Sequence, residues 1–349
     1  MPVNLGVIGC GVIGRKHLEA AQGCDDIRLA AVADLNDQAA RDAAARFDVP
    51  KVYDSAGALL ADAEIDAVVL ALITGVRGEV ALEALEAGKH VLLEKPPAMN
   101  LAELERIKAA AGDRVVASCS SRLTFNDVAE KARAVVAAGE LGTIRTIHVR
   151  CLQGVGPFNP DRNPPEWRVR RDLNGGGYLV NWGVYDLDFM LYVLGDAFEP
   201  GDVLASAWPV APHLANGRVD PDSNAECHVV ALVRGRGGET LFLERGEFTA
   251  LPKSMRWQIV GEKAALSLGM LRSETPPTLT LHRADANDGL VSETLLEDYG
   301  EDVQHRMPVR DFAEAIRAGR PPRTGFDRAV RIQRILDAVY QSLDTASTA

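Results

Sequence analysis

The 349-residue sequence lacks the features that mark several large classes of protein. It has no cluster of basic residues, and its formal net charge of −11 argues against nucleic acid or anionic membrane as a partner, because both attract positive patches. The longest apolar run, residues 67–76, falls well short of the roughly 20 residues that cross a bilayer. The N-terminus shows no basic region followed by a long apolar stretch, so we expect no secretory signal peptide.

Cysteine, histidine and serine patterns exclude further kinds of site. The five cysteines are scattered and form no Cys-x-x-Cys pair, which argues against a disulfide framework and a zinc site. The seven histidines show no His-x-His or His-x-x-x-His spacing, so no metal site is predicted. The sequence contains no Gly-x-Ser-x-Gly elbow, so acyl transfer is not predicted. These absences favour a protein of the reducing cytoplasm.

The first third of the chain alternates strand-like and helix-like segments. The strand-like segments are short, aliphatic and apolar throughout, and they cover residues 3–9, 27–34, 66–72, 90–96 and 115–120. Such strands are typical of a parallel sheet that is covered on both faces. The sequence therefore predicts an α/β fold that begins with a doubly wound Rossmann domain over residues 1–121.

The pattern changes after residue 143. Segments with alternating or hairpin-like character cover residues 143–150, 226–233, 239–248, 256–262 and 278–283. A glycine-rich turn, GRGG, separates two of them, and helical segments at 309–319 and 326–343 close the chain. We expect residues 122–349 to form an α+β domain with a large open sheet, mixed or antiparallel.

A glycine-rich loop follows the first strand-like segment. The sequence G-C-G-V-I-G places Gly9, Gly11 and Gly14 around Val12 and Ile13, between a buried strand and a helix. In this context Gly9 can form the tight turn, Gly11 admits a pyrophosphate and Gly14 permits close packing of helix and strand. The helix N-terminus attracts negative charge. The loop predicts a dinucleotide site, although the glycines could serve only a tight turn.

Asp34 lies 20 residues after Gly14, at the end of the second strand-like segment. A carboxylate at this place binds the adenosine ribose hydroxyls in dinucleotide-binding domains and repels a 2′-phosphate. We therefore expect NAD as cofactor, with NADP not excluded, because a nearby arginine can offset the repulsion. The alternative is that Asp34 caps the following helix.

Glu94, Lys95 and Pro96 follow the strand-like segment that begins at residue 90. In open α/β sheets, ligands bind beyond the carboxyl ends of the strands. An ammonium group there could hydrogen-bond a substrate hydroxyl and stabilise the alkoxide that develops as hydride leaves. The alternative is an ordinary solvated lysine.

Three motifs together resemble one family. G-C-G-V-I-G, AGKHVLLEKP and the mid-chain GGG-x-L-x-x-x-G-x-x-x-x-D are similar to the glucose-fructose oxidoreductase, inositol dehydrogenase and rhizopine-catabolism (Gfo/Idh/MocA) family, over essentially the whole chain. The resemblance implies a Rossmann domain and a substrate domain whose open sheet face makes a homodimer or homotetramer. It also implies NAD(P)-dependent oxidation or reduction of a secondary carbinol of a sugar, cyclitol or related polyol.

The resemblance also assigns site residues. Lys95 matches the catalytic lysine, and Glu94 precedes it in the same motif. Ser120 and the Trp167-Arg168 pair match positions that often contact the cofactor.

A second set of residues fits the family pattern less closely. Arg122 is a candidate polar contact to the substrate. Relatives often carry Thr-Pro-Asn and a histidine where this chain has Leu72, Ile73, Thr74 and Arg77. We expect Leu72 and Thr74 at the cofactor.

The mid-chain segment GGGYLVNWGVYDLD places polar residues on a helix that is otherwise apolar. Asn181, Tyr185 and Asp188 follow helical spacing, and such a line must find hydrogen-bond partners in protein or ligand. Relatives commonly have Asp and His where Asn181 and Tyr185 stand, and some branches have Tyr at the second place. We expect Tyr185 to act as acid or base, Asn181 to hold the substrate, and Asp188 to brace the helix or contact substrate. The three leading glycines are expected to let the backbone pass close to ligand or to the other domain.

Two alternatives keep the cofactor but change the function. Transient oxidation of a glycoside followed by elimination and return of the hydride would make a redox-neutral glycosidase, as in some relatives. The departures at positions 77 and 181 would also suit a non-catalytic dinucleotide sensor.

Overall fold

The computed structural model describes residues 1–156, 166–215, 219, 222–269, 279–297 and 303–346. Contacts divide the chain into two compact units. Unit 1 comprises Met1–Arg122 with Val303–Val330, and unit 2 comprises Leu123–Asp302 with Arg331–Ala349. The predicted second domain ran from residue 122 to the end of the chain, whereas Val303–Val330 packs within unit 1, where Val309, Phe312 and Ala313 join the apolar core.

Unit 1 contains a six-stranded parallel sheet in the order β3-β2-β1-β4-β5-β6, which confirms the predicted doubly wound topology. The strands are β1 (Val3–Ile8), β2 (Ile27–Ala33), β3 (Lys51–Tyr53), β4 (Ala67–Leu70), β5 (His90–Leu93) and β6 (Val116–Ser118). Sequence reasoning missed β3, because this edge strand has three residues, of which none is fully buried.

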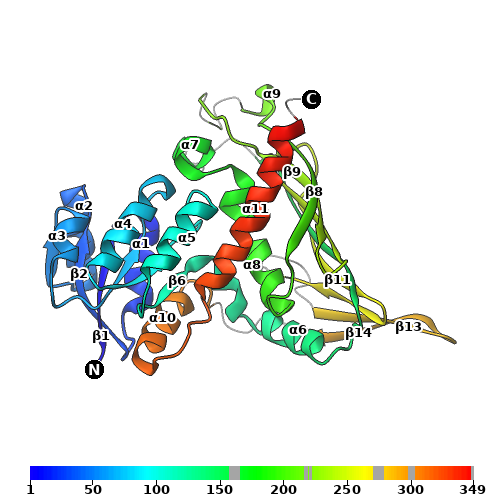
Figure 1. Ribbon diagram of the computed structural model, residues 1–349, viewed down its shortest axis with the longest axis horizontal. Helices are drawn as coiled ribbons and strands as arrows, with labels where there is room; N and C mark the ends of the chain where they lie inside the picture. The colour runs from blue at the N-terminus through cyan, green and yellow to red at the C-terminus, as the bar shows by residue number, and fades with distance from the viewer. Residues whose placement is uncertain (157–165, 216–218, 220–221, 270–278, 298–302, 347–349) are drawn as a thin grey trace. The chain divides into compact units, whose positions relative to one another are not determined.

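Helices cover both faces of this sheet (Figure 1). One apolar core includes α1 (Val12–Ala21), α2 (Asp37–Phe47) and α10 (Met307–Ala318). The other includes α3 (Ala56–Leu60), α4 (Thr74–Glu86) and α5 (Leu101–Ala110). Because successive strand residues point to opposite faces, a strand with both faces covered must be apolar at every position, as β4 is.

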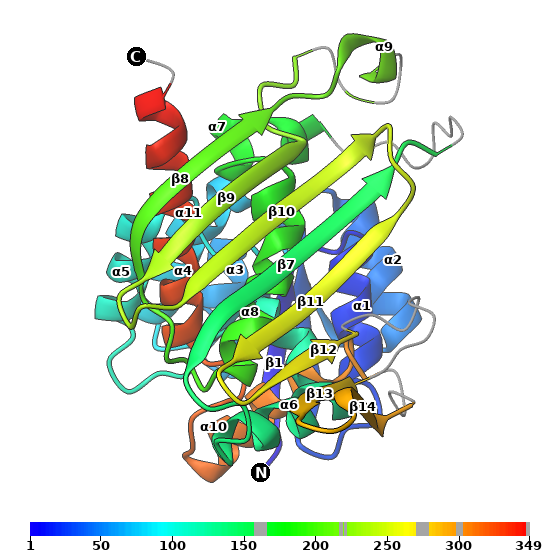
Figure 2. The same cartoon turned by 90° about the vertical axis from the view of Figure 1, so that its right-hand side faces the viewer.

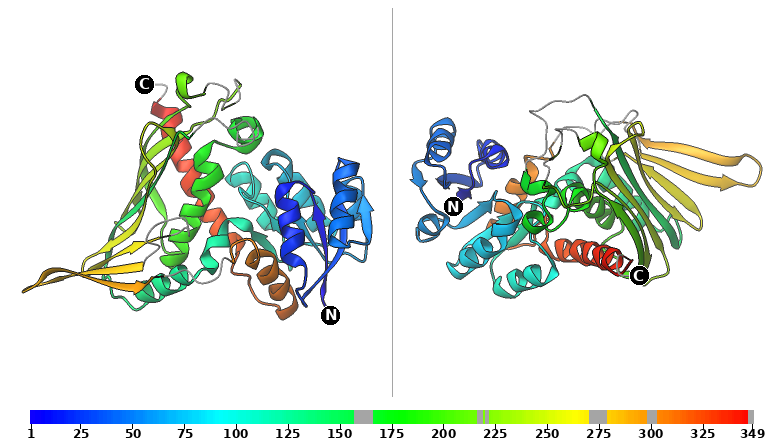
Figure 3. Two further views of the ribbon diagram at one scale, coloured as in Figure 1. Left: turned by 180° about the vertical axis from the view of Figure 1, so that it is seen from behind. Right: turned by 90° about the horizontal axis from the view of Figure 1, so that it is seen from above.

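Unit 2 contains an eight-stranded mixed sheet in the order β14-β13-β12-β11-β7-β10-β9-β8 (Figure 2). Its strands are β7 (Ile144–Gly154), β8 (Pro200–Trp208), β9 (His228–Gly235), β10 (Thr240–Thr249), β11 (Ser254–Gly261), β12 (Ala264–Leu268), β13 (Leu279–Asp285) and β14 (Gly289–Leu296). Among the described strands of this sheet, only β7 and β10 pair in parallel, and the predicted hairpin at GRGG joins β9 to β10. The β13–β14 hairpin extends beyond its neighbours (Figure 3).

One face of the unit 2 sheet carries the apolar core of that unit. α6 (Asp127–Ala137), α8 (Val184–Val193) and the part of α11 (Phe326–Ala346) after Arg331 pack against it. The opposite face is turned to the viewer in Figure 2 and carries several exposed apolar side chains. Short helices occur at Cys119–Phe125 (η1), Glu166–Val169 (η3), Arg171–Asn174 (α7) and Pro212–Ala215 (α9). No helix in the described part of the chain has the length and apolar character needed to span a membrane.

Candidate functional site

The glycine loop connects β1 to α1 in unit 1. Gly9 adopts a φ of +95°, which few residues other than glycine adopt, and a Cβ on Gly14 would collide with the carbonyl oxygen of Gly9. A Cβ on Gly11 would meet no atom within 4 Å, so the backbone at the start of α1 is open to approach. α1 has no side-chain cap, and its N–H groups remain available for an anion. This geometry fits a dinucleotide pyrophosphate.

Asp34 lies beside this loop and is fixed by the backbone. Its Oδ2 accepts a hydrogen bond from the Cys10 N–H at 2.7 Å, and its Oδ1 accepts one from Asn36 N–H at 2.8 Å. The side chain that caps α2 is that of Asn36, so Asp34 is not the helix cap. Burial and the Asp34 charge raise the pKa of the Cys10 thiol to about 11, which keeps it neutral next to the carboxylate.

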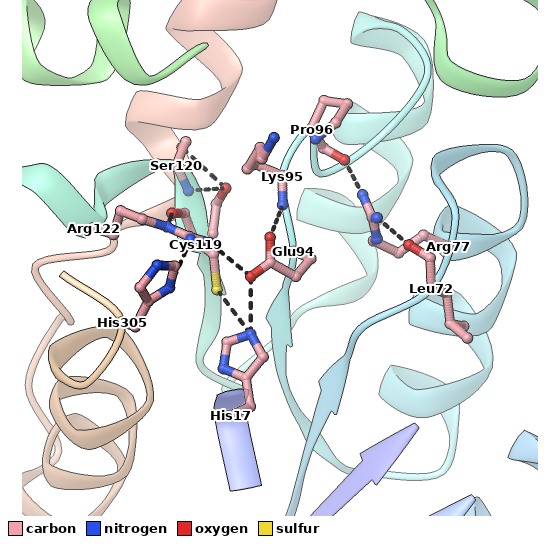
Figure 4. A network of polar contacts seen from close by, with 11 residues as sticks. His17, Leu72, Arg77, Glu94, Lys95, Pro96, Cys119, Ser120, Arg122 and His305 are labelled. Atoms are coloured by element: carbon pink, nitrogen blue, oxygen red, sulfur yellow. Dashed lines mark hydrogen bonds and ion pairs between the residues drawn. The ribbon is translucent and has the colours of Figure 1, made fainter. Parts of the chain in front are cut away.

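Glu94 organises the carboxyl end of β5, directly before Lys95 (Figure 4). Its side chain is buried, with Oε1 2.9 Å from His17 Nε2 and 2.8 Å from Arg122 Nη2. Its Oε2 accepts a hydrogen bond from the Lys95 backbone N–H at 3.0 Å. Burial by itself would raise the pKa of Glu94, but Arg122 and His17 outweigh it and hold that pKa well below its usual value.

His17, Glu94 and Cys119 place their donor atoms within 4.8 Å of one another. The Arg122 guanidinium, however, already neutralises Glu94 at the same Oε1 that faces His17. Burial and the Glu94 charge raise the pKa of the Cys119 thiol well above its usual value, which disfavours a thiolate ligand. The donor set therefore suits a hydrogen-bonded ion cluster better than a cation site.

Arg122 was predicted to contact the substrate. Its guanidinium is buried, and besides Glu94 it lies 3.0 Å from His305 Nδ1. This arrangement makes Arg122 part of the support of the lysine loop, and a substrate contact by the same residue stays a prediction.

Arg77 connects two loops at the same edge of the sheet. This residue of α4 is 1% exposed, and its guanidinium donates to the carbonyl oxygens of Leu72 and Pro96. Leu72 follows β4 and Pro96 follows Lys95, so a single side chain fixes both loops. Burial lowers the pKa of Arg77 to about 10, which still leaves it charged at neutral pH. The sequence identified Arg77 only as a departure from the family pattern.

The glycine-led segment in unit 2 forms a π-helix, Leu179–Gly183, that continues into α8. A Cβ on Gly176 would collide with the Tyr340 hydroxyl, and one on Gly177 with the backbone of Glu226. These two glycines thus permit close packing inside unit 2. That packing explains them without the predicted approach to ligand or to the other domain.

A half-buried carboxylate that sequence reasoning missed holds this turn. Glu226 accepts hydrogen bonds from the backbone N–H groups of Gly177, at 2.9 and 3.0 Å, and of Leu179, at 3.1 Å. The Tyr340 hydroxyl donates to it as well, at 3.0 Å. Burial raises the pKa of Glu226, an effect that these donors reduce.

Asn181, Tyr185 and Asp188 are all buried, at 5%, 6% and 1% exposure. The next face of the helix carries Asp186, to which the sequence analysis gave no role. Asp186 accepts hydrogen bonds at 3.0 Å from both Arg245 and the indole N–H of Trp257, and all three side chains are buried. The helix is therefore anchored to β10 and β11 through Asp186.

The predicted site residues fall into two groups. Unit 1 holds Gly9, Gly11, Val12, Ile13, Gly14, Asp34, Leu72, Thr74, Glu94, Lys95, Ser120 and Arg122, and unit 2 holds Trp167, Arg168, Asn181, Tyr185 and Asp188. Within unit 1 the loops after β1, β2, β4 and β5 end at one edge of the sheet, because its strands are parallel. The meeting of Lys95 with Tyr185, which involves both units, stays a prediction.

Comparison with known proteins identifies both parts of the chain. The model of an oxidoreductase family with an NAD-binding Rossmann fold matches residues 3–119, and that of the GFO/IDH/MocA C-terminal domain matches residues 129–267. A myo-inositol 2-dehydrogenase of Thermotoga maritima is 26% identical over 322 residues, which are 92% of this chain and 90% of the relative. A D-glucoside 3-dehydrogenase of Escherichia coli is 25% identical over 358 residues, 99% of this chain and 97% of the relative.

Solved structures agree on the fold. A levoglucosan dehydrogenase in complex with NADH superposes with a TM-score of 0.81 at 21% identity, covering 99% of this chain and 98% of that one. The two family models together span most of the sequence, and both sheets have the matching architecture. The chain belongs to the Gfo/Idh/MocA family of oxidoreductases.

Proposed function

We propose that this protein transfers hydride between NAD and a secondary carbinol of a sugar, cyclitol or related polyol. The observation that carries the proposal is the arrangement at one edge of the unit 1 sheet. The glycine loop, Asp34 and Lys95, whose backbone N–H is bonded to Glu94, all lie at the carboxyl ends of its strands. When bound, NAD supplies the hydride acceptor or donor. Relatives with named activities include an inositol and a glucoside dehydrogenase, which supports a cyclitol or a sugar as substrate.

The remaining chemistry belongs to side chains of this chain. We assign to the Lys95 ammonium a hydrogen bond to the reacting oxygen, where it stabilises developing negative charge. Tyr185 exchanges the proton of that oxygen through its phenol, and the lysine charge favours the phenolate form. Asn181 cannot carry a proton, so it holds a neighbouring hydroxyl. The Glu94 and Arg77 contacts keep the lysine loop in place between turnovers.

An activity screen tests this proposal directly. The protein with NAD and a panel of inositols, aldoses and glycosides is expected to accumulate NADH, which is followed by its absorbance. Release of an aglycone without net NADH would instead establish the redox-neutral glycosidase. Tight NAD(H) binding without turnover of any polyol or keto-sugar would contradict an enzymatic role.

The Asp34 carboxylate should determine the choice of cofactor. Asp34→Asn removes the negative charge and keeps one acceptor oxygen, which can serve only one of the backbone N–H groups of Cys10 and Asn36. We expect the ratio of kcat/KM with NAD to that with NADP to fall about 10- to 100-fold, the worth of a hydrogen bond to a charged group. Steady-state kinetics with both cofactors measures the ratio, and an unchanged ratio would show that Asp34 does not contact the ribose.

We further propose that the open face of the unit 2 sheet binds a second copy of the chain, as a homodimer or within a homotetramer. Exposed apolar side chains gather on three neighbouring strands, β8, β9 and β10, at Leu204, Trp208, Val230, Leu232 and Phe242. A contiguous apolar patch of this kind is unusual on a monomer and typical of a protein interface. None of the five cysteines forms a disulfide, which fits a reducing compartment, and we place the protein in the cytoplasm.

A charge on this patch should separate the copies. Leu232→Glu on β9 is expected to convert the oligomer to monomer, because it buries an unpaired carboxylate in the interface. Leu290→Glu on β14 is the matched control, since Leu290 is exposed but lies at the other end of the sheet. Light scattering coupled to size-exclusion chromatography gives the masses. A wild-type monomer, or the same loss of mass in both variants, would contradict the proposed interface.

A further inference from the structure

Trp182 is an exception in the helical segment that carries Tyr185. Trp182 is 41% exposed, whereas all the other residues from Leu179 to Val193 are buried. Its ring centroid lies 5.9 Å from that of Tyr185, with an angle of 51° between the rings. An indole left in water forgoes the stabilisation that burial of its apolar surface would give. The exposed ring therefore stands next to the residue that we assign to proton exchange.

A buried ion cluster fixes this ring from one side. The Arg245 guanidinium lies over the Trp182 ring at 5.9 Å, within the range of a cation–π contact. Arg245 in turn pairs with Asp186 at 3.0 Å and with Glu247 at 3.6 Å. Asp186 also accepts the hydrogen bond from Trp257. Trp182 is nevertheless 41% exposed, so part of its ring surface is open to solvent while the ring keeps its Arg245 contact.

A flat, held aromatic face has a defined chemical preference. Its negative quadrupole attracts the slightly positive C–H bonds of a ligand, and its area matches the face of a six-membered ring. A pyranose or cyclitol with equatorial hydroxyls presents such a C–H face, whereas an open-chain polyol presents no contiguous one. Since Arg245 already holds the indole, little side-chain freedom is lost when a ligand stacks on it.

We propose that Trp182 is the platform on which the ring of the substrate stacks, and that the substrate is a ring-form sugar or cyclitol instead of an open-chain polyol. The inference rests on the proposed function for the position of the reacting carbon, which the stacked ring would present to Tyr185. It adds a specificity residue that the family motifs do not contain, because position 182 falls at an unspecified place in the mid-chain motif.

The test compares Trp182→Leu, which keeps an apolar side chain without a ring, with Trp182→Phe, which keeps an aromatic face. Calorimetry in the presence of NADH measures the binding of myo-inositol, scyllo-inositol and methyl β-glucopyranoside, with sorbitol as the open-chain probe. We expect Trp182→Leu to weaken binding of the ring compounds about three- to tenfold, the usual worth of aromatic geometry beyond buried area. Trp182→Phe should retain most of the affinity, and sorbitol and NADH binding should not change.

The outcomes separate this inference from the function on which it rests. Ring compounds that bind wild type and Trp182→Leu equally, or that do not bind wild type at all, would overturn the platform. An equal loss for sorbitol would overturn the preference for rings. Ring compounds that bind through Trp182 but yield no NADH with NAD would support the platform while they contradict the dehydrogenase. Turnover that is unaffected by Trp182→Leu would support the dehydrogenase and contradict the platform.

Discussion

Tyr185→Phe is expected to lower kcat by about 10²- to 10⁴-fold, because a positioned acid or base contributes that much to proton transfer. The phenol is 6% exposed on a helix that is anchored by the Asp186 contacts, so the ring should stay in place when the hydroxyl is removed. The measurement is steady-state turnover with the substrate found in the activity screen, together with single-turnover formation of NADH.

Tyr178→Phe is the matched control for this variant. Tyr178 is also 6% exposed and lies in the same segment, but its ring packs edge-on against Phe248 in a small separate apolar cluster. We expect this control to keep near wild-type kcat and unchanged KM. Full activity of Tyr185→Phe would remove Tyr185 from the mechanism, and an equal loss in both variants would show that the effect comes through packing.

Glu94→Gln is expected to destabilise the fold by about 3–5 kcal/mol at neutral pH, the typical cost of removing one partner from a buried ion pair. The amide would leave the Arg122 guanidinium without its carboxylate, in a place where both side chains are 7% exposed or less. It would also weaken the acceptor for the Lys95 backbone N–H, so kcat should fall as well. Chemical denaturation followed by fluorescence gives the free energy of unfolding.

The same variant gives a pH dependence with a defined sign. The pKa of Glu94 in the folded protein lies below its usual value of 4.5, so its contribution is present above that value and is lost as the pH falls. The difference in melting temperature between wild type and Glu94→Gln should therefore narrow below about pH 4.5. Glu19→Gln, which breaks an exposed pair with Lys16, should change the melting temperature little at any pH. A constant difference across the acid range would contradict the assigned ion pair.

Local patterns in the sequence were enough to predict much of the fold. The glycines at 9, 11 and 14 and the carboxylate at 34 act within a single β-α-β unit, where spacing along the chain sets the geometry. Long apolar runs predicted the central strands correctly, because burial on both faces demands them. β3, β8 and β14 escaped prediction because β3 has only three residues and β8 and β14 are largely exposed, so their patterns resemble loops. β12 was also missed, although its residues alternate between buried and partly buried.

The partners of the buried charges could not be read from the sequence. Glu94 meets His17 across 77 residues and Arg122 across 28, and Asp186 meets Arg245 across 59. Nothing in the local pattern distinguishes these residues from solvated charges, since their partners arrive only when the sheets and helices assemble. Arg77 is the sharpest case, because its hydrogen bonds go to carbonyl oxygens, which every residue has.

By itself the sequence determined which residues form the dinucleotide loop, where the strands of the parallel sheet run, and which family pattern the chain follows. Only the tertiary structure decided that 303–330 completes unit 1, that Glu94 and Arg77 hold the lysine loop, and that Trp182 stays exposed beside Tyr185. The physical reason is the distance along the chain over which each interaction acts. Hydrophobic periodicity and backbone conformation act over a few residues, whereas burial and charge pairing depend on which distant segments the fold brings together.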